Sequence, residues 1–284
     1  MAAAAYSLDP VTHWAAWEAK VASWVARAQA DLLVFPEYGA MELAHLDGAD
    51  VSGSLEASLW AAARHGPSAQ KVWGDLAKHH ECHILAPSGP WDTGGARPVN
   101  RAWLHGPQGT LGFQDKAMMT RFEDEVWTVS PGQGQTLFEI DGLRVGVLIC
   151  YDAEFPALAA AHWDQGADAL LVPSCTDSLV GFTRVQVGVR ARALEGQGVV
   201  AQAVTVGACP WSPAMDENHG HAGIYGPPDL GFPDTGILAE GDMNRSGWVR
   251  AAIDPAAIAT VRADGQVLNH RHRALARAAA KRRR

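Results

Sequence analysis

Short apolar segments alternate with amphipathic ones along most of the chain. Three of the apolar segments stop at a proline, as Phe35 does before Pro36, and all are strand-sized. The amphipathic segments carry apolar residues three and four positions apart, which is the spacing of one helix face. The predicted strands are 31–35, 83–86, 169–172 and 199–206, and the predicted helices are 55–64, 69–80, 157–165, 184–195 and 255–262. This alternation predicts an α/β fold with a largely buried sheet.

The first helix is predicted to open at Asp9-Pro10, because aspartate is a good N-cap and proline fits the first helical turn. Its apolar positions then follow at helical spacing, and we expect this aromatic stripe to pack in the core. The stripe consists of Trp14, Trp17, Val21, Trp24 and Ala28.

Two hairpins are predicted as well. Segments 100–105 and 110–114 flank a turn-rich loop, and segments 137–140 and 144–149 flank Asp141-Gly142, a strong hairpin signal. Hairpins place antiparallel strands beside the parallel ones that alternating strands and helices produce. The sheet is therefore expected to be mixed.

Composition fits one folded domain. The chain has 284 residues, is 48% hydrophobic and holds 11 Trp, 7 Phe and 4 Tyr, which excludes a disordered chain. We expect no secretory signal and no membrane span, because no apolar run approaches the roughly 20 residues that a span needs. The four cysteines, Cys82, Cys150, Cys175 and Cys209, are too few and too far apart for a disulfide scaffold. A reducing, cytoplasmic location is predicted.

The charge is unevenly distributed. The net charge is −8, yet segment 269–284 holds seven Lys and Arg residues and no acid, so the remaining chain is still more acidic. An acidic body argues against nucleic acid as the main partner. We expect a domain over 1–268 and a basic, solvated tail over 269–284; a docking role for the tail is the alternative.

Three reactive side chains follow predicted strands: Glu37, Lys116 and Cys150. Ligands of open α/β sheets gather at the carboxyl ends of strands, so these groups could meet at one rim. A thiol needs a base to become a nucleophile, which Glu37 could be, and Lys116 could stabilise an oxyanion with the main-chain N–H of Tyr151. Each residue also has an ordinary interpretation: a core cysteine, a helix-capping glutamate or a surface lysine.

Other chemical signals are weaker. His79, His80, Cys82 and His83 straddle a helix end and a strand start, and His219 and His221 lie in a Gly-rich loop; both sets favour ordinary residues over a metal site. No phosphate loop, dinucleotide glycine pattern or serine nucleophile elbow occurs. We expect neither a metal nor an organic cofactor.

The segments around the three reactive residues resemble the signatures of the carbon–nitrogen hydrolase (nitrilase) superfamily, in that family's order. They are Phe35-Pro-Glu-Tyr38, Asp115-Lys116 and Gly146-Val-Leu-Ile-Cys-Tyr-Asp152. Further landmarks that resemble the family are Asn100-Arg-Ala102, Ser130-Pro-Gly132, Arg190-Ala-Arg-Ala-Leu-Glu195 and Ile224-Tyr-Gly-Pro227. The resemblance implies an αββα sandwich that dimerises. It is greatest to a bacterial branch in which some members carry a fused acetyltransferase domain, which we do not expect in a chain of this length.

The resemblance also implies roles. Glu37 would be the general base, Lys116 the oxyanion stabiliser and Cys150 the nucleophile. The family uses a second glutamate between the lysine and the cysteine, and the candidates here are Glu123 and Glu125. In relatives this glutamate lies seven residues before the glycine of the Pro-Gly turn, which selects Glu125.

The predicted substrate is a small linear amide, cleaved through a cysteine thioester with release of ammonia or an amine. Segments that line the pocket in relatives hold Trp127, Tyr151, Cys175, Thr176, Asp177 and Trp211, with plain packing as the alternative for most of them. The chain departs from the usual family pattern at three places, and these departures bear mainly on which substrate is bound. They are Lys116-Ala-Met-Met, Pro173-Ser-Cys-Thr-Asp177 and Glu195-Gly196. The alternatives are an N-carbamoyl-amine amidohydrolase, a nitrilase, or a non-catalytic binding protein.

Overall fold

The computed structural model describes residues 1–280 and shows thirteen strands there, hydrogen-bonded into one branched, mixed sheet. The strands are β1 Ala2–Tyr6, β2 Leu32–Val34, β3 His83–Leu85, β4 Gly89–Trp91, β5 Val99–Gly106, β6 Gly109–Asp115, β7 Leu137–Ile140, β8 Leu143–Val147, β9 Ala169–Ser174, β10 Val199–Thr205, β11 Gly223–Tyr225, β12 Ile237–Glu240 and β13 Gly247–Arg250. The main path runs β4-β5-β3-β2-β1-β10-β9-β8-β7. Its centre, from β3 to β8, is parallel, and both predicted hairpins are present as β5–β6 and β7–β8.

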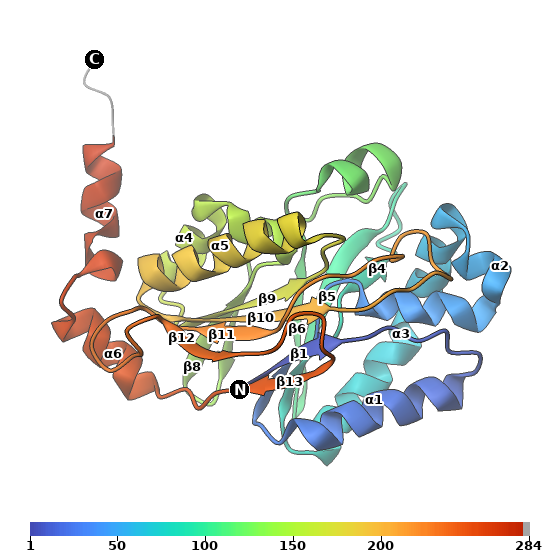
Figure 1. The fold of residues 1–284 in the computed structure, drawn as a ribbon, viewed down its shortest axis with the longest axis horizontal. Helices are drawn as coiled ribbons and strands as arrows, with labels where there is room; N and C mark the ends of the chain where they lie inside the picture. Colours follow the sequence, from blue (N-terminus) through green and yellow to red (C-terminus); the bar gives the residue numbers. More distant parts are fainter. Residues whose placement is uncertain (281–284) are drawn as a thin grey trace.

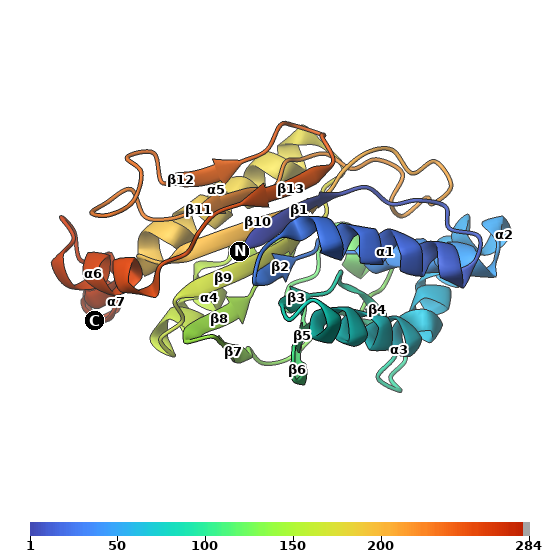
Figure 2. The ribbon, with the colours of Figure 1, turned by 90° about the horizontal axis from the view of Figure 1, so that it is seen from below.

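Helices cover the sheet from two sides (Figure 1). They are α1 Trp14–Ala28, α2 Ala49–Ser52, α3 Leu55–His79, α4 Pro156–Asp164, α5 Leu179–Gly196, α6 Pro255–Asp264 and α7 Asn269–Ala279, with the short turns η1 Gly39–Asp47, η2 Phe122–Val126 and η3 Cys150–Glu154. Helices α4 and α5 lie on one side of the strands, and α1 and α3 lie on the other (Figures 1 and 2). The sheet curls between them into the two β-layers of an αββα sandwich, the fold that we predicted.

The alternation of side chains along β1 shows how the layers form. Ala3 and Ala5 face the central core between the two halves of the sheet, whereas Ala4 and Tyr6 face the aromatic core beneath α1 and α3. Because each face of β1 packs on one of these cores, all five of its residues are at most 3% exposed. Small alanines let the layers approach closely at this central position.

Strand β1 was not predicted, because alanine has a low strand propensity and only burial on both faces makes it a strand here. The predicted helix start at Asp9-Pro10 is wrong. Helix α1 begins at Trp14, where His13 Nδ1 accepts a hydrogen bond from the N–H of Ala16 at 3.2 Å. Asp9 instead pairs with Lys20 at 2.9 Å.

Helix α3 joins the two predicted segments 55–64 and 69–80 into one helix that passes through Pro67. The proline is exposed, and the helix face that packs on the sheet continues past it from Ala63 to Ala69. Burial of that face maintains the helix although a proline cannot donate a backbone hydrogen bond.

The chain ends with α6, as predicted, and with α7, which buries none of its residues and projects from the body (Figure 1). Arg273 and Arg277 of α7 pair with Asp164 of α4. The predicted basic tail also includes residues 281–284, which lie outside the described residues. No helix within residues 1–280 is both long and apolar enough to cross a membrane.

Candidate active site

The structure brings Glu37, Lys116 and Cys150 together in the lining of one cavity of about 260 Å³. Glu37 follows β2, Lys116 follows β6, and Cys150 opens η3 after β8. All three are at most 4% exposed. The strand ends therefore converge as the sequence predicted, and a carboxylate, an amine and a thiol share one enclosed space.

Glu37 is held by three hydrogen bonds from three different segments. Its Oε1 accepts from Lys116 Nζ at 2.7 Å and from Asn100 Nδ2 at 3.1 Å, and its Oε2 accepts from the main-chain N–H of Cys175 at 3.0 Å. The next residue, Tyr38, has a φ of 54°, in the left-handed region that side chains other than glycine rarely adopt. This sharp turn ends the extended segment beyond β2 and leaves Glu37 at the cavity.

Lys116 lies between two carboxylates. Its Nζ donates to Glu37 Oε1 at 2.7 Å and to Glu123 Oε2 at 2.6 Å. Glu123 is 2% exposed and also accepts from Tyr38 Oη at 2.7 Å and from the N–H and the hydroxyl of Thr120 at 2.9 and 2.8 Å. The positive charge of Lys116 thus faces two carboxylates, and both oxygens of each carboxylate accept hydrogen bonds.

The second glutamate of the site is therefore Glu123 by position, and the choice of Glu125 does not match the structure. Glu125 is exposed and pairs with Arg121 at 2.7 Å on the surface of η2. Residues two apart in a helical turn do not face the same side, so only one of the two glutamates can reach the cavity. A sequence signal for Glu123 exists in Thr120-Arg-Phe-Glu123, a capping box in which Thr120 and Glu123 bond each other's main-chain N–H.

Cys150 is presented by a strained turn. Its φ is 50°, in the left-handed region, and it opens the short helix η3 after the apolar segment that contains β8. Its Sγ donates to the main-chain oxygen of Cys175 at 3.5 Å. Because the N–H of Cys175 binds Glu37, the main chain at Cys175 contacts both the thiol and the carboxylate.

The environment sets the protonation of these groups. Burial raises the pKa of Glu37 to about 7, although the Lys116 ammonium opposes the shift. Burial alone would lower the pKa of Lys116, but the Glu123 and Glu37 carboxylates raise it, so the lysine stays charged. Burial would raise the pKa of Glu123, yet Lys116 and the other donors hold it below its usual value. Burial and the nearby Glu37 raise the pKa of the Cys150 thiol, so the resting thiol is protonated.

Asp152, the last residue of the family-like segment 146–152, had no predicted role and is buried beside the site. Its carboxylate accepts from the main-chain N–H groups of Met118 at 2.8 Å, Ala117 at 3.2 Å and Ile149 at 3.2 Å. It thereby joins the loop after Lys116 to the turn that carries Cys150. Burial raises its pKa to about 6, while these hydrogen bonds oppose the shift.

Five of the six residues predicted for the pocket wall line the cavity: Trp127, Tyr151, Cys175, Thr176 and Asp177. Trp211 is absent from the lining and packs beside His45. Trp127 is also tied to the scaffold, since its Nε1 donates to the main-chain oxygen of Leu55 at 2.9 Å. Contact between these five residues and a substrate stays a prediction.

The histidine clusters do not form a metal site in the described part of the chain. Within residues 1–280, no three His, Cys, Asp or Glu side chains are grouped so that they could hold a metal ion. Cys82 is buried, whereas His79 and His80 are exposed. His83 lies 3.5 Å from Asp141 instead.

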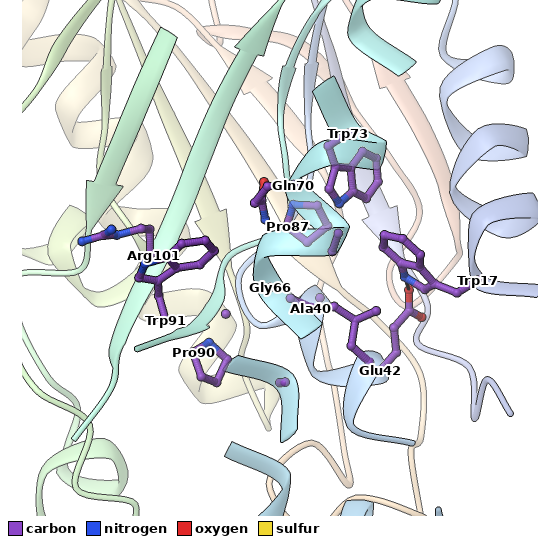
Figure 3. A pocket seen from close by; sticks show the side chains of 15 residues that line it. Trp17, Ala40, Glu42, Gly66, Gln70, Trp73, Pro87, Pro90, Trp91 and Arg101 are labelled. Atoms are coloured by element: carbon purple, nitrogen blue, oxygen red, sulfur yellow. Dashed lines mark hydrogen bonds between the residues drawn. The ribbon is translucent and has the colours of Figure 1, made fainter. Parts of the chain in front are cut away.

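A second, much smaller cavity lies beside α3 and η1 (Figure 3). Its volume of about 10 Å³ holds at most about one water. The carboxylate of Glu42 at its edge is already used: it accepts from Tyr6 Oη at 2.6 Å, Lys20 Nζ at 2.6 Å and Trp17 Nε1 at 3.0 Å. This network fixes α1 and β1 to the segment after Glu37, and we assign it to the scaffold.

Comparison with known proteins agrees with the geometry. The family model for carbon–nitrogen hydrolases matches residues 2–263. A probable hydrolase of Bacillus subtilis, YhcX, is 30% identical over 263 residues, which are 92% of this chain and 50% of that protein, so the chain spans about half the length of this relative. The 2-oxoglutaramate amidase of Bacillus subtilis is 31% identical over 236 residues, 82% of each protein.

The fold is shared with solved structures too. Saccharomyces cerevisiae Nit3, a member of branch 10 of the nitrilase superfamily, superposes with a TM-score of 0.71 at 22% identity, covering 92% of each chain. The family match spans nearly the whole described chain, and related proteins of this family are named amidases and hydrolases. The chain belongs to the carbon–nitrogen hydrolase family.

Proposed function

We propose that the chain hydrolyses a small linear amide through a thioester on Cys150, releasing ammonia or a small amine. The observation that carries the proposal is the placement of Cys150, Glu37 and the Lys116–Glu123 pair around one cavity of about 260 Å³. That volume suits a compact substrate. The amide bond is also the bond named for one relative, the 2-oxoglutaramate amidase.

In the first half-reaction, Cys150 Sγ attacks the amide carbon while its proton passes to Glu37. A pKa of about 7 lets Glu37 act as both base and acid near neutral pH. Lys116 Nζ and the main-chain N–H of Tyr151 stabilise the negative oxygen of the tetrahedral intermediate. The C–N bond then breaks, Glu37 returns the proton to the leaving nitrogen, and the acyl group stays on sulfur.

In the second half-reaction, water attacks the thioester carbon and gives a proton to Glu37. The C–S bond breaks, the carboxylic acid leaves, and Glu37 returns the proton to the thiolate. Glu123 takes no proton in this cycle. It holds Lys116 charged and in place.

The test is a screen of small amides, N-carbamoyl amines and nitriles for ammonia release. Cys150→Ala should abolish turnover, because no other group can replace the nucleophile, whereas Cys82→Ala should keep activity, since Cys82 lies outside the cavity lining. Acid quench during turnover should add the acyl mass to the Cys150 peptide. Hydrolysis by Cys150→Ala, or an adduct found only on another cysteine, would overturn the mechanism.

The same screen separates the alternative substrates. A carbamoyl compound releases carbon dioxide together with ammonia, whereas an amide releases no carbon dioxide. A nitrile yields acid only after two additions of water. If carbamoyl compounds were hydrolysed much faster than amides of equal length, the reaction would be reassigned while the nucleophile stayed the same.

We also propose that the enzyme is a homodimer in a reducing compartment such as the cytoplasm. Helix α5 supports the first point with an exposed apolar stripe at seven-residue spacing: Val180 (68% exposed), Val187 (63%) and Leu194 (41%). Apolar residues at this spacing suit helix packing against a second copy. A reducing compartment would preserve the thiol of Cys150.

A further inference from the structure

The lining of the active-site cavity is strongly acidic. Six carboxyl groups contribute to it, against two cationic side chains, Lys116 and Arg184. The carboxyl groups belong to Glu37, Glu123, Glu154, Asp177, Asp216 and Glu217. A cavity with this excess of carboxyl groups would repel a negatively charged substrate.

The two cations are already engaged. Lys116 lies between Glu37 and Glu123 at the closed end of the cavity. The Arg184 side chain is exposed, and its Nε lies 3.7 Å from the Glu154 carboxylate, so it forms an ion pair with an acid of the same lining. Both cations of the lining therefore already contact a carboxylate of the protein, and a substrate carboxylate would have to compete with it.

Three acids of the lining lack such a partner. Asp177, Asp216 and Glu217 are exposed, and within the described chain no Lys or Arg lies within ion-pair distance of them. The nearest basic group is the His219 ring, 3.8 Å from Glu217. Because Glu37 and Glu123 are buried while these three are exposed, half of the six carboxyl groups lie at the solvent-exposed part of the lining, which we call the mouth.

Apolar surface lines the cavity as well. Phe122, Trp127, Val185 and Met215 contribute to its wall together with Pro213 and Ala214. Such a wall suits a chain of methylene groups, and the acidic mouth suits a positive charge at the end of that chain. The two features together describe a linear amide with a distal cation.

Building on the proposed amidase function, we infer that the enzyme selects linear amides whose far end carries a protonated amine, and that Asp177, Asp216 and Glu217 provide this specificity. The preference is electrostatic. It favours the cation during entry and in the bound state, and it disfavours ω-amides of dicarboxylic acids. The chain would then differ in substrate charge from its relative that is named for 2-oxoglutaramate.

The test compares three amides of similar length: 5-aminopentanamide, hexanamide and glutaric acid monoamide. We expect kcat/KM to fall in the order cation, neutral, anion. Asp216→Asn and Glu217→Gln each neutralise one carboxylate. Each should reduce the ratio of kcat/KM for the cationic amide to kcat/KM for the anionic amide by about three- to tenfold, which is the effect of one charge that is partly exposed to solvent. Raising salt from about 0.05 to about 0.5 M should shrink the same ratio. Glu139→Gln, the same change at an exposed acid outside the lining, should leave the ratio as it is.

The outcomes separate this inference from the proposed function. Cys150-dependent hydrolysis of hexanamide without preference for the cation would overturn the charge selection and leave the amidase function standing. Preference for the anion that is lost in Arg184→Gln would overturn it as well and would make Arg184 the carboxylate receptor. Absence of ammonia from all three amides, with the protein folded, would count against the proposed function itself.

Discussion

Exchange of Glu123 for glutamine tests the central correction to the site. Glu123→Gln keeps the shape of the side chain but removes one of the two anions that contact Lys116 Nζ, the one at 2.6 Å. The amide oxygen can still accept from Lys116 and Thr120, and the Tyr38 hydroxyl can turn to accept from the new NH₂ group. The main change is therefore the loss of a buried charge.

The size of the effect follows from these contacts. Loss of a preorganised charge beside an oxyanion stabiliser typically raises the activation barrier by about 3–4 kcal/mol, so kcat/KM should fall by about 10²- to 10³-fold. The free energy of unfolding should fall by only about 1–3 kcal/mol, because Lys116 keeps Glu37 as a partner. Glu125→Gln is the matched control. It removes only a surface pair with Arg121, worth at most about 0.5 kcal/mol, so activity should change less than twofold.

The assay measures ammonia release against pH together with denaturant unfolding of each variant. The Glu123 carboxylate raises the pKa of Glu37, so its removal should move the acid limb of the kcat/KM profile to lower pH. A merely destabilised protein would not show that movement. Near-normal turnover by Glu123→Gln with a large loss in Glu125→Gln would refute the reasoning and restore the count from Gly132.

Three further predictions concern pH and assembly. In the parent enzyme kcat/KM should rise with pH through about 7, because Glu37 must be ionised to take the thiol proton; a limb near 4.5 would show that its pKa is not raised. Buried His162 has its pKa lowered to about 4, so the unfolded chain binds its proton first as pH falls, and about 3 kcal/mol of stability should be lost between pH 6.5 and 4. His162→Leu should lack that loss in denaturant unfolding at pH 7 and 4.5, and identical pH dependence of both proteins would contradict it. Light scattering should give about twice 30.2 kDa for the parent and one chain mass for Val187→Glu; a monomeric parent, or a dimeric variant, would exclude α5 as the interface.

Much of the fold could be predicted because burial leaves a direct trace in the sequence. Apolar runs that stop at prolines marked β2, β3 and β9, and turn residues marked both hairpins. The predicted end of the third run at Pro173 is wrong, because β9 continues through Pro173 to Ser174 beside β10. Strand β1 left no such trace, since its alanines are as suitable for a helix as for a strand. Its state is decided by neighbours distant in sequence, β2 and β10.

The residues of the site differ in the same way in how far they could be predicted. The strand ends made Glu37 and Cys150 candidates, and the resemblance to the family then selected them. Glu123 belongs to the short turn η2, whose register depends on Thr120 and Lys116 and not on a residue count from Gly132. Gly146 shows a constraint of the same kind: a Cβ there would lie 2.5 Å from Nδ1 of the buried His162, a contact that no sequence pattern displays.

The contacts divide the cavity into a rigid end and a solvated end. Asp152 binds main-chain N–H groups on both sides of the reacting centre, and Gly132 donates to the main-chain oxygen of Lys116 at 2.7 Å, so the lysine and the nucleophile hold fixed relative positions. At the mouth, the Asp216 carboxylate bonds only the neighbouring N–H of Glu217, at 2.9 Å, and both residues are exposed. Precise geometry is needed where bonds form and break, whereas selection by charge acts over several ångströms and tolerates a solvated side chain. Under the proposed function, the chemistry and the choice of substrate rest on different residues, so substitutions at the mouth should redirect the enzyme among amides while the rigid end keeps the reaction the same.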